Sequence, residues 1–351
     1  MFFSRERKVK QERRKMIKIF VASWSEIQAG RRFRVRKAGT LLSRDSGTNF
    51  LFQRIEYELG IIRMKIVTKL SVLFVSSLML LAAFTPALAF TNPIMAPRMN
   101  IVNSLNGTVL STNWSGYAVT GASGSVTSAS GSWVVPTVTG SNGQYVAFWV
   151  GIDGYSSKTV EQTGVLAQVT GNRRTSTTSY YAWYEFYPSE SIIEITTATK
   201  TGTSTSTPAT VKPGDTISAT VAYVSGTAFT LTINDITEGW TSTTPGSQQG
   251  ATESSAEWIV EAPSSTFGVL PLANFETAYF GSDKTGVTGT CDATIGGVSG
   301  AISSFPTASV EQINMVTSRG AAKDSTSPLS TDGTSFSVTW ESSGSGLFGG
   351  F

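Results

Sequence analysis

The sequence contains no histidine and a single cysteine, and each absence excludes a class of site. Without histidine, the 351-residue chain cannot build a Ser-His-Asp triad, a Cys-His pair or an HExxH zinc site. With only Cys291, it can form neither an intrachain disulfide nor a cysteine-based zinc cluster. A fold made from this chain must be stabilised by its apolar core, which a β-sandwich of this size can supply.

A sustained helical period is also missing from the sequence. Short runs rich in β-branched and aromatic residues recur instead, separated by Gly, Ser, Asn and Pro, and this pattern predicts an all-β sandwich or barrel. The predicted strands are 113–119, 126–136, 144–154, 160–169, 180–188, 216–224, 229–235, 256–263, 273–280, 310–316 and 335–342.

The amino-terminal part differs sharply in charge from the rest. Residues 1–63 hold 16 basic and 6 acidic side chains. A complete secretory signal then begins at Met64, with two lysines, an apolar run and a small-residue cleavage site ending at Ala89. We therefore expect export with cleavage after Ala89 and interpret residues 1–63 as a start-site error. A nucleic-acid-binding arm and a membrane anchor are the alternatives, but the apolar run is short for a membrane span.

The remaining chain divides by composition into a leader, one domain and a tail. The expected boundaries are 90–111 for a leader or short propeptide, 112–342 for the domain and 343–351 for a flexible tail. Residues 90–351 hold only 9 basic and 18 acidic side chains. Acid unfolds proteins mainly by protonating carboxylates that are paired in the native state, and this segment has few such pairs to break. We therefore expect the fold to survive moderately acidic solution.

Strand parity separates an apolar face from a polar, aromatic one. Alternate side chains of a strand point to opposite faces of its sheet. In the predicted strands within 144–188 and 256–263, one face is apolar and carries residues such as Val146, Phe148, Val150 and Val260. The opposite face carries Trp149, Asp153, Gln162, Trp183, Glu185, Glu257 and Glu261. If these strands are neighbours, the sequence predicts a polar cleft lined by aromatic residues.

Five motifs in this order, NWSGY, WVGIDG, EQTGV, YAWYEFYP and AEWIVE, resemble those of the glutamic peptidases, or eqolisins. The resemblance covers residues 112–342. It implies a lectin-like β-sandwich of two antiparallel sheets that cleaves proteins at acidic pH with a Gln and a Glu, and without metal or cofactor. By this resemblance Gln162 and Glu261 are the catalytic residues, and the cleft is lined by Trp149, Asp153, Trp183 and Glu185.

The chain also departs from the family pattern. It lacks the cysteines of fungal members, Tyr181 occupies a position that is often acidic, and Phe186 replaces a Trp. These changes bear on stability and subsite preference more than on chemistry. We expect an extracellular, monomeric enzyme that acts on protein or peptide substrates, with no nucleic-acid partner and no stable membrane anchor.

The two implied catalytic residues suit amide hydrolysis. The reaction needs a base to deprotonate water and a donor to the developing oxyanion. The Glu261 carboxylate supplies the base and the Gln162 amide supplies the donor. A Glu with an ordinary pKa near 4.3 still acts as a base in acid. Glu161 has the wrong parity for this face, whereas Glu257 shares the parity of Glu261 and is distinguished from it only by the motif.

Other functions fit parts of the same pattern. A β-sandwich glycoside hydrolase would use Glu185 and Glu261 as its carboxyl pair, with Trp149 and Trp183 as sugar platforms. A carbohydrate-binding module would keep the aromatic residues and need no acid. An aspartic peptidase needs two Asp-Thr/Ser-Gly loops, and the chain has one, at 45–47.

Overall fold

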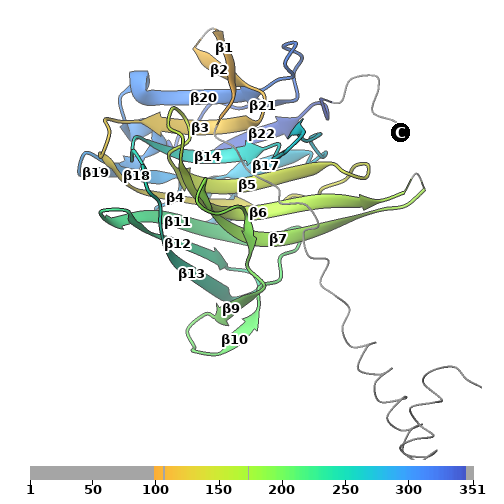
Figure 1. Ribbon diagram of the computed structural model, residues 1–351, viewed down its shortest axis with the longest axis horizontal. Helices are drawn as coiled ribbons and strands as arrows, with labels where there is room; N and C mark the ends of the chain where they lie inside the picture. The colour runs from red at the N-terminus through yellow and green to blue at the C-terminus, as the bar shows by residue number, and fades with distance from the viewer. Residues whose placement is uncertain (1–98, 106, 173, 345–351) are drawn as a thin grey trace, which may run out of the picture. The chain divides into compact units, whose positions relative to one another are not determined.

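Two large β-sheets make up the part of the chain that the computed structural model describes, residues 99–105, 107–172 and 174–344 (Figure 1). The expected start-site extension, the signal, residues 90–98 of the leader and residues 345–351 of the tail lie outside these described residues. The first sheet has nine strands, in the order β1 (Ile101–Leu105), β2 (Thr108–Ser111), β20 (Val310–Met315), β3 (Trp114–Thr120), β14 (Ser255–Glu261), β5 (Tyr145–Ile152), β6 (Val160–Gly171), β7 (Ser176–Tyr187) and β8 (Ile193–Glu194).

The second sheet has eleven strands. Its main path runs β10 (Ser206–Pro208), β9 (Thr197–Lys200), β13 (Trp240–Ser247), β12 (Ala228–Asp235), β11 (Thr216–Ser225), β4 (Val126–Val134), β17 (Thr277–Phe280), β22 (Phe336–Trp340) and β21 (Asp324–Thr326). β18 (Asp292–Ile295) pairs with β4 and with β19 (Val298–Ala301). The smaller elements are the hairpin β15 (Ser264–Ser265) and β16 (Gly268–Val269), helix α3 (Ser282–Thr285), and the 3₁₀ turns η1 (Ile302–Ser304) and η2 (Thr307–Ser309).

The predicted all-β sandwich of two antiparallel sheets is confirmed, with one parallel pairing inside it. Strands whose apolar residues alternate were predicted correctly, as in β11 and β12, where buried and less buried positions alternate. The exception to antiparallel pairing is β2 beside β20. Residues 101–111, expected within a leader of little pattern, form β1 and β2 and belong to the first sheet.

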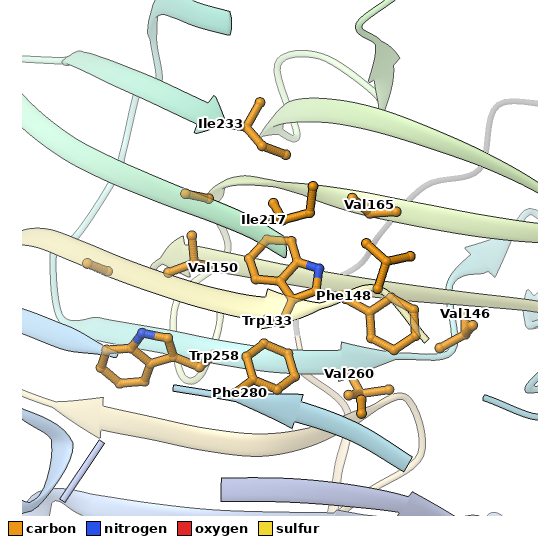
Figure 2. Close-up of a cluster of buried hydrophobic side chains, with 14 of the residues drawn as sticks. Trp133, Val146, Phe148, Val150, Val165, Ile217, Ile233, Trp258, Val260 and Phe280 are labelled. Atoms are coloured by element: carbon orange, nitrogen blue, oxygen red, sulfur yellow. The ribbon is translucent and has the colours of Figure 1, made fainter. Parts of the chain in front are cut away.

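The main core lies between the two sheets. Figure 2 shows Phe148 and Val150 of the first sheet packed with Trp133 and Ile217 of the second. Trp258 crosses the interface, where its Nε1 donates a hydrogen bond of 2.7 Å to the carbonyl of Ser130 in β4. The two sheets are thus joined by buried apolar side chains and by the hydrogen bond from the Trp258 indole. No helix among the described residues has the length and apolar character to span a membrane.

Two carboxyl groups are buried away from the polar, aromatic face. Asp324 is 1% exposed and accepts hydrogen bonds from the Ser115 hydroxyl at 2.8 Å and from the Met315 N–H at 2.9 Å. Burial raises the pKa of Asp324 to about 7, against the lowering effect of these hydrogen bonds. Burial likewise raises the pKa of Asp235 to about 7. Both groups carry a proton in acid while the native state persists.

We predict that the protein becomes more stable as pH falls from 7 to 5. The folded state binds protons at Asp235 and Asp324 below pH about 7, whereas the unfolded chain binds them only near pH 3.9. Stability therefore rises as pH falls through this window. Thermal unfolding followed by circular dichroism should show a higher Tm at pH 5 than at pH 7. Asp235→Asn should flatten this dependence, and a Tm that drops in mild acid would contradict the assignment.

Candidate active site

The strands that carry the predicted site residues are neighbours, in the order β14-β5-β6-β7. Gln162 lies opposite Gly151 on one side and Glu185 on the other. Glu261, the last residue of β14, lies opposite Ala147 of β5. Residues paired across neighbouring strands point to the same face of a sheet, and so do alternate residues of one strand. Gln162, Glu185 and Glu261 therefore share one face. The sequence-based assumption that the strands are adjacent is confirmed.

Two glycines make room for the indoles on this face. Gly164 lies between Trp149 and Trp183 in the register. A Cβ at Gly164 would lie 2.6 Å from the Trp149 Cβ, and one at Gly151 would lie 2.8 Å from the Trp149 ring. The ring of Trp149 therefore extends over Gly151 toward the Gln162 side chain.

Gln162 and Glu185 form a buried pair. The Gln162 Nε2 donates a hydrogen bond of 2.6 Å to Glu185 Oε2, and both residues are 0% exposed. A carboxylate accepts but does not donate, so this bond fixes which end of the amide faces Glu185. Within the described part of the chain, Gln162 Oε1 has no hydrogen-bond partner.

Glu261 lies in a pocket of indoles. Its Oε2 accepts a hydrogen bond of 2.8 Å from Trp149 Nε1. Burial, and then repulsion from Glu185, raise the pKa of Glu261 well above its ordinary value, while the side chains of Trp149, Trp114 and Asn113 oppose this rise. The ordinary Glu pKa assumed from the sequence is therefore wrong for this folded state.

Trp114 belongs to the site although the sequence motif NWSGY assigned it no role. It lies opposite Glu261 in the register of β3 with β14. Its ring meets that of Trp149 edge to face, with centroids 4.8 Å apart. Strand parity applied to the motif would have placed it on this face, because Trp114 alternates with the core residues Tyr117 and Val119.

Asp153 holds a loop in place. Its backbone has a φ of 71°, a left-handed conformation that Asp tolerates better than most residues. Its carboxylate accepts backbone hydrogen bonds from Thr252 at 2.7 Å, Glu253 at 2.9 Å and Ser254 at 2.9 Å, just before β14 begins. Asp153 thus fixes the start of the strand that ends at Glu261, a role that the motif did not indicate.

Two further glutamates lie near the site. Glu257 shares the face of Glu261 and is paired with Gly151 of β5, which is paired on its other side with Gln162 of β6. Glu161 points to the other face, as its parity predicted, since it pairs with the core residue Phe186. Burial raises the pKa of both glutamates well above the ordinary value.

The site face is closed in this structure, although the sequence predicted a cleft. The side chains of Trp149, Gln162, Trp183, Glu185 and Glu261 are all 0% exposed. A second apolar cluster occupies the same face and includes residues from the amino-terminal segment and from neighbouring strands, among them Met99, Val109, Val160 and Ile313. A substrate can therefore reach these groups only when this face opens.

The described residues offer no group of three or more His, Cys, Asp or Glu side chains placed to hold a metal ion. A basic residue that no motif singled out, Lys323, is 4% exposed and lies close to this region. Nothing in its local sequence distinguishes it from a solvated surface lysine.

We predict that Asp153→Asn destabilises the fold. The amide would direct an NH₂ group at backbone N–H donors that now share a carboxylate, at a cost of about 2–3 kcal/mol in the free energy of unfolding. Denaturant unfolding at neutral pH measures this loss. The exposed residue Asp283 supplies the control, because Asp283→Asn should leave the unfolding midpoint unchanged. Equal midpoints for both variants would refute the structural role.

Comparison with known proteins identifies the family and agrees with the fold. The model of the Peptidase A4 family matches residues 112–327. Aspergillopepsin-2 from Aspergillus niger is 31% identical over 224 residues, which are 54% of this chain and 72% of the relative. The crystal structure of scytalido-glutamic peptidase with a transition state analog inhibitor is similar in fold, with a TM-score of 0.51 and 22% identity over 66% of this chain and 98% of that one.

A second structure of that peptidase, with a peptide based transition state analog, gives a TM-score of 0.50 at 22% identity, with the same coverage of both chains. The family match spans all five motifs, and it decides against the glycoside hydrolase and the carbohydrate-binding module. The chain belongs to the peptidase A4 family, and it is a glutamic-type endopeptidase.

Proposed function

We propose that the protein is a secreted acid endopeptidase that hydrolyses protein substrates with Gln162, Glu261 and an activated water. The observation that carries this proposal is the position of Trp149. Its Nε1 bonds Glu261, while its ring extends over Gly151 toward Gln162. One indole thus bonds to Glu261 and lies over the glycine that is paired with Gln162.

Glu261 acts first as a base and then as an acid. As a carboxylate it accepts a proton from water while the water oxygen bonds to the carbonyl carbon of the substrate. The tetrahedral intermediate then collapses and the C–N bond breaks. The proton held by Glu261 passes to the leaving nitrogen, which restores the carboxylate. None of these proton transfers requires a histidine.

Gln162 stabilises the oxyanion through its amide. One N–H of Nε2 is directed at Glu185, and the second N–H of the same nitrogen is available to the substrate oxygen. Because Glu185 fixes the orientation of the amide, the donor is held in place before the reaction begins. Such preorganised donors are worth most where water is excluded.

The raised pKa of Glu261 shapes the dependence of activity on pH. A base must be deprotonated to act, so kcat/KM falls as pH drops through the pKa of Glu261 in the free enzyme. Burial and Glu185 raise that pKa. Opening of the site to solvent relieves part of this burial, and activity in acid therefore depends on the open form.

Secretion into an acidic medium is the setting that suits this chain. Support comes from the signal pattern that begins at Met64 and from the absence of histidine. The buried carboxyl groups that stay protonated when pH falls add to it. Sequencing the exported product should find Phe90 or a later residue at its amino terminus.

We predict that Glu261→Gln abolishes peptidase activity and leaves the fold intact, because the change is nearly isosteric. Gln162→Ala should lower kcat by about 10²–10³, the scale for losing one oxyanion donor. Since both groups act on one transition state, the double variant should be little worse than the worse single variant. The measurement is hydrolysis of denatured casein across acidic pH, with circular dichroism as the check on folding.

Two buried glutamates provide matched controls for these variants. Glu161→Gln changes a carboxyl next to Gln162 on the opposite face, and Glu257→Gln changes one four positions before Glu261 on the same strand. Both controls should keep most activity. A folded Glu261→Gln protein that digests casein at the wild-type rate would end the assignment of the dyad.

We further predict that Trp149→Phe moves the acid limb of kcat/KM to higher pH. The Trp149 N–H stabilises the charged form of Glu261, so its loss raises the pKa of that carboxyl and depletes the base in acid. A shift of about one pH unit is expected from one charge-assisted hydrogen bond.

Trp133→Phe is the control for this prediction, because Trp133 is equally buried but lies in the core between the sheets. Its pH profile should match that of the wild type even if its Tm falls. An acid limb that stays in place or moves to lower pH in Trp149→Phe would show that the hydrogen bond does not tune Glu261.

A further inference from the structure

Lys323 is a buried cation with one hydrogen bond. Its side chain is 4% exposed, and its Nζ donates to the carbonyl of Thr112 at 3.1 Å. An ammonium has three N–H donors, and burying a charge is costly unless it is paired. The ion pair found in the described ranges joins Lys212 to Glu238 at the surface and does not involve Lys323.

Asp324 and Glu261 attract this charge and oppose the lowering of the Lys323 pKa by burial, but neither is hydrogen-bonded to the ammonium among the described residues. Asp324 is the next residue, but its two oxygens accept hydrogen bonds from the Met315 N–H and the Ser115 hydroxyl. Burial lowers the pKa of Lys323 to about 8, so the side chain carries its charge at neutral and acidic pH.

The lysine is held in position along its whole length. Its backbone N–H donates to Met315 O at 2.8 Å, and its carbonyl accepts from the Glu341 N–H at 2.8 Å. Gly344 packs on the stem, where an added Cβ would lie 2.9 Å from the Lys323 Cδ. The ammonium is thus fixed by packing before any ligand arrives.

A cavity of about 310 Å³ adjoins this ammonium. Lys323 lines it together with Thr112, Leu270, Thr317 and Ser318. This volume is at the lower end of the range for small-molecule sites, which is about 300–1,000 Å³. The lining combines hydroxyl groups, an apolar wall and a single positive charge.

The cavity lies beside the proposed catalytic carboxylate. Thr112, which accepts the Lys323 hydrogen bond, precedes Asn113, whose carbonyl accepts from the Ala262 N–H at 2.8 Å. Ala262 directly follows Glu261 at the end of β14. Another part of the lining comes from the chain after the β15–β16 hairpin, where the Leu270 N–H donates to Pro263 O at 2.8 Å. A peptide bound at Glu261 and continuing past the end of β14 would present its next residues here.

We propose that this cavity is a substrate subsite in which Lys323 binds a carboxylate of the peptide, from either an acidic side chain or the carboxyl terminus. The proposal rests on the proposed function, because it takes Glu261 as the point of cleavage. Asp324 and Glu261 attract Lys323 without bonding to its ammonium, so a peptide carboxylate would supply a direct ion pair, and Thr317 and Ser318 lie on the same lining.

The test uses pairs of internally quenched peptides that differ only in one Glu or Gln, placed in turn at each position around the scissile bond. At pH about 5 the substrate Glu is ionised, and we expect the full-length secreted enzyme to favour Glu at one position by about tenfold in kcat/KM, or 1.4 kcal/mol. A second series compares free and amidated carboxyl termini. Preference in either series supports the subsite and identifies the source of the carboxylate.

Lys323→Met should bring the Glu/Gln ratio of kcat/KM to about one, and Lys323→Arg should retain the preference. If Lys323→Met fails to fold, the pH dependence of the wild-type preference tests the subsite. The wild-type Glu/Gln ratio should decline toward one as pH falls below about 4, where the substrate Glu is protonated.

The failures of the two proposals are distinguishable. Wild-type enzyme that cuts no peptide contradicts the proposed function. Wild-type enzyme that cuts Glu and Gln peptides, and free and amidated peptides, equally well overturns the subsite alone. A Lys323→Met variant that keeps the preference also overturns it, whatever the variant does to the acid limb through the attraction between Lys323 and Glu261.

Discussion

The register of β5 between β14 and β6 is the constraint on which the site depends. Side chains of a strand alternate between faces, so a shift by one residue would turn Trp149 into the core and Phe148 onto the site. The observed register sets Glu261, Trp149 and Gln162 along a diagonal across three strands. The core residues on the other face resist any slip, because each is packed against the second sheet. The same strands therefore determine both the packing of the sandwich and the geometry of the proposed catalytic groups.

Burial is the second physical condition that these residues share. A carboxyl group removed from water favours its neutral form, and Glu257 and Glu261 both have raised pKa values for this reason. In acid Glu257 and Glu261 lose their charge, which lowers the cost of keeping the face closed. At higher pH the same carboxyl groups ionise against one another. In the proposed mechanism, protonation of the same side chains would therefore affect both the chemistry and the stability.

Much of this arrangement could be predicted from the sequence, because alternation of apolar residues reports both a strand and its buried face. The strands around Gln162 and Glu261 carry that signal strongly. Strands such as β9, β10 and β13 do not, since they are rich in Ser and Thr and are held by backbone hydrogen bonds. Asp153 was predicted to line the cleft from a motif, which cannot show that its oxygens bind a loop about a hundred residues later in the chain. Lys323 gave no signal, because its burial is created by segments distant in sequence.

Through the parallel pairing of β2 with β20, the amino-terminal segment covers one side of β20. β1 is the edge of the first sheet and is short, with polar residues in the middle, features that discourage association between sheets. Maturation that removed residues through Ser111 would expose the backbone groups of β20 along one side, and an unpaired strand of this kind is a template for another chain. Trimming that stops before Ile101 leaves this edge covered. The extent of any amino-terminal processing would therefore decide whether this sheet edge stays covered or becomes able to pair with a second molecule.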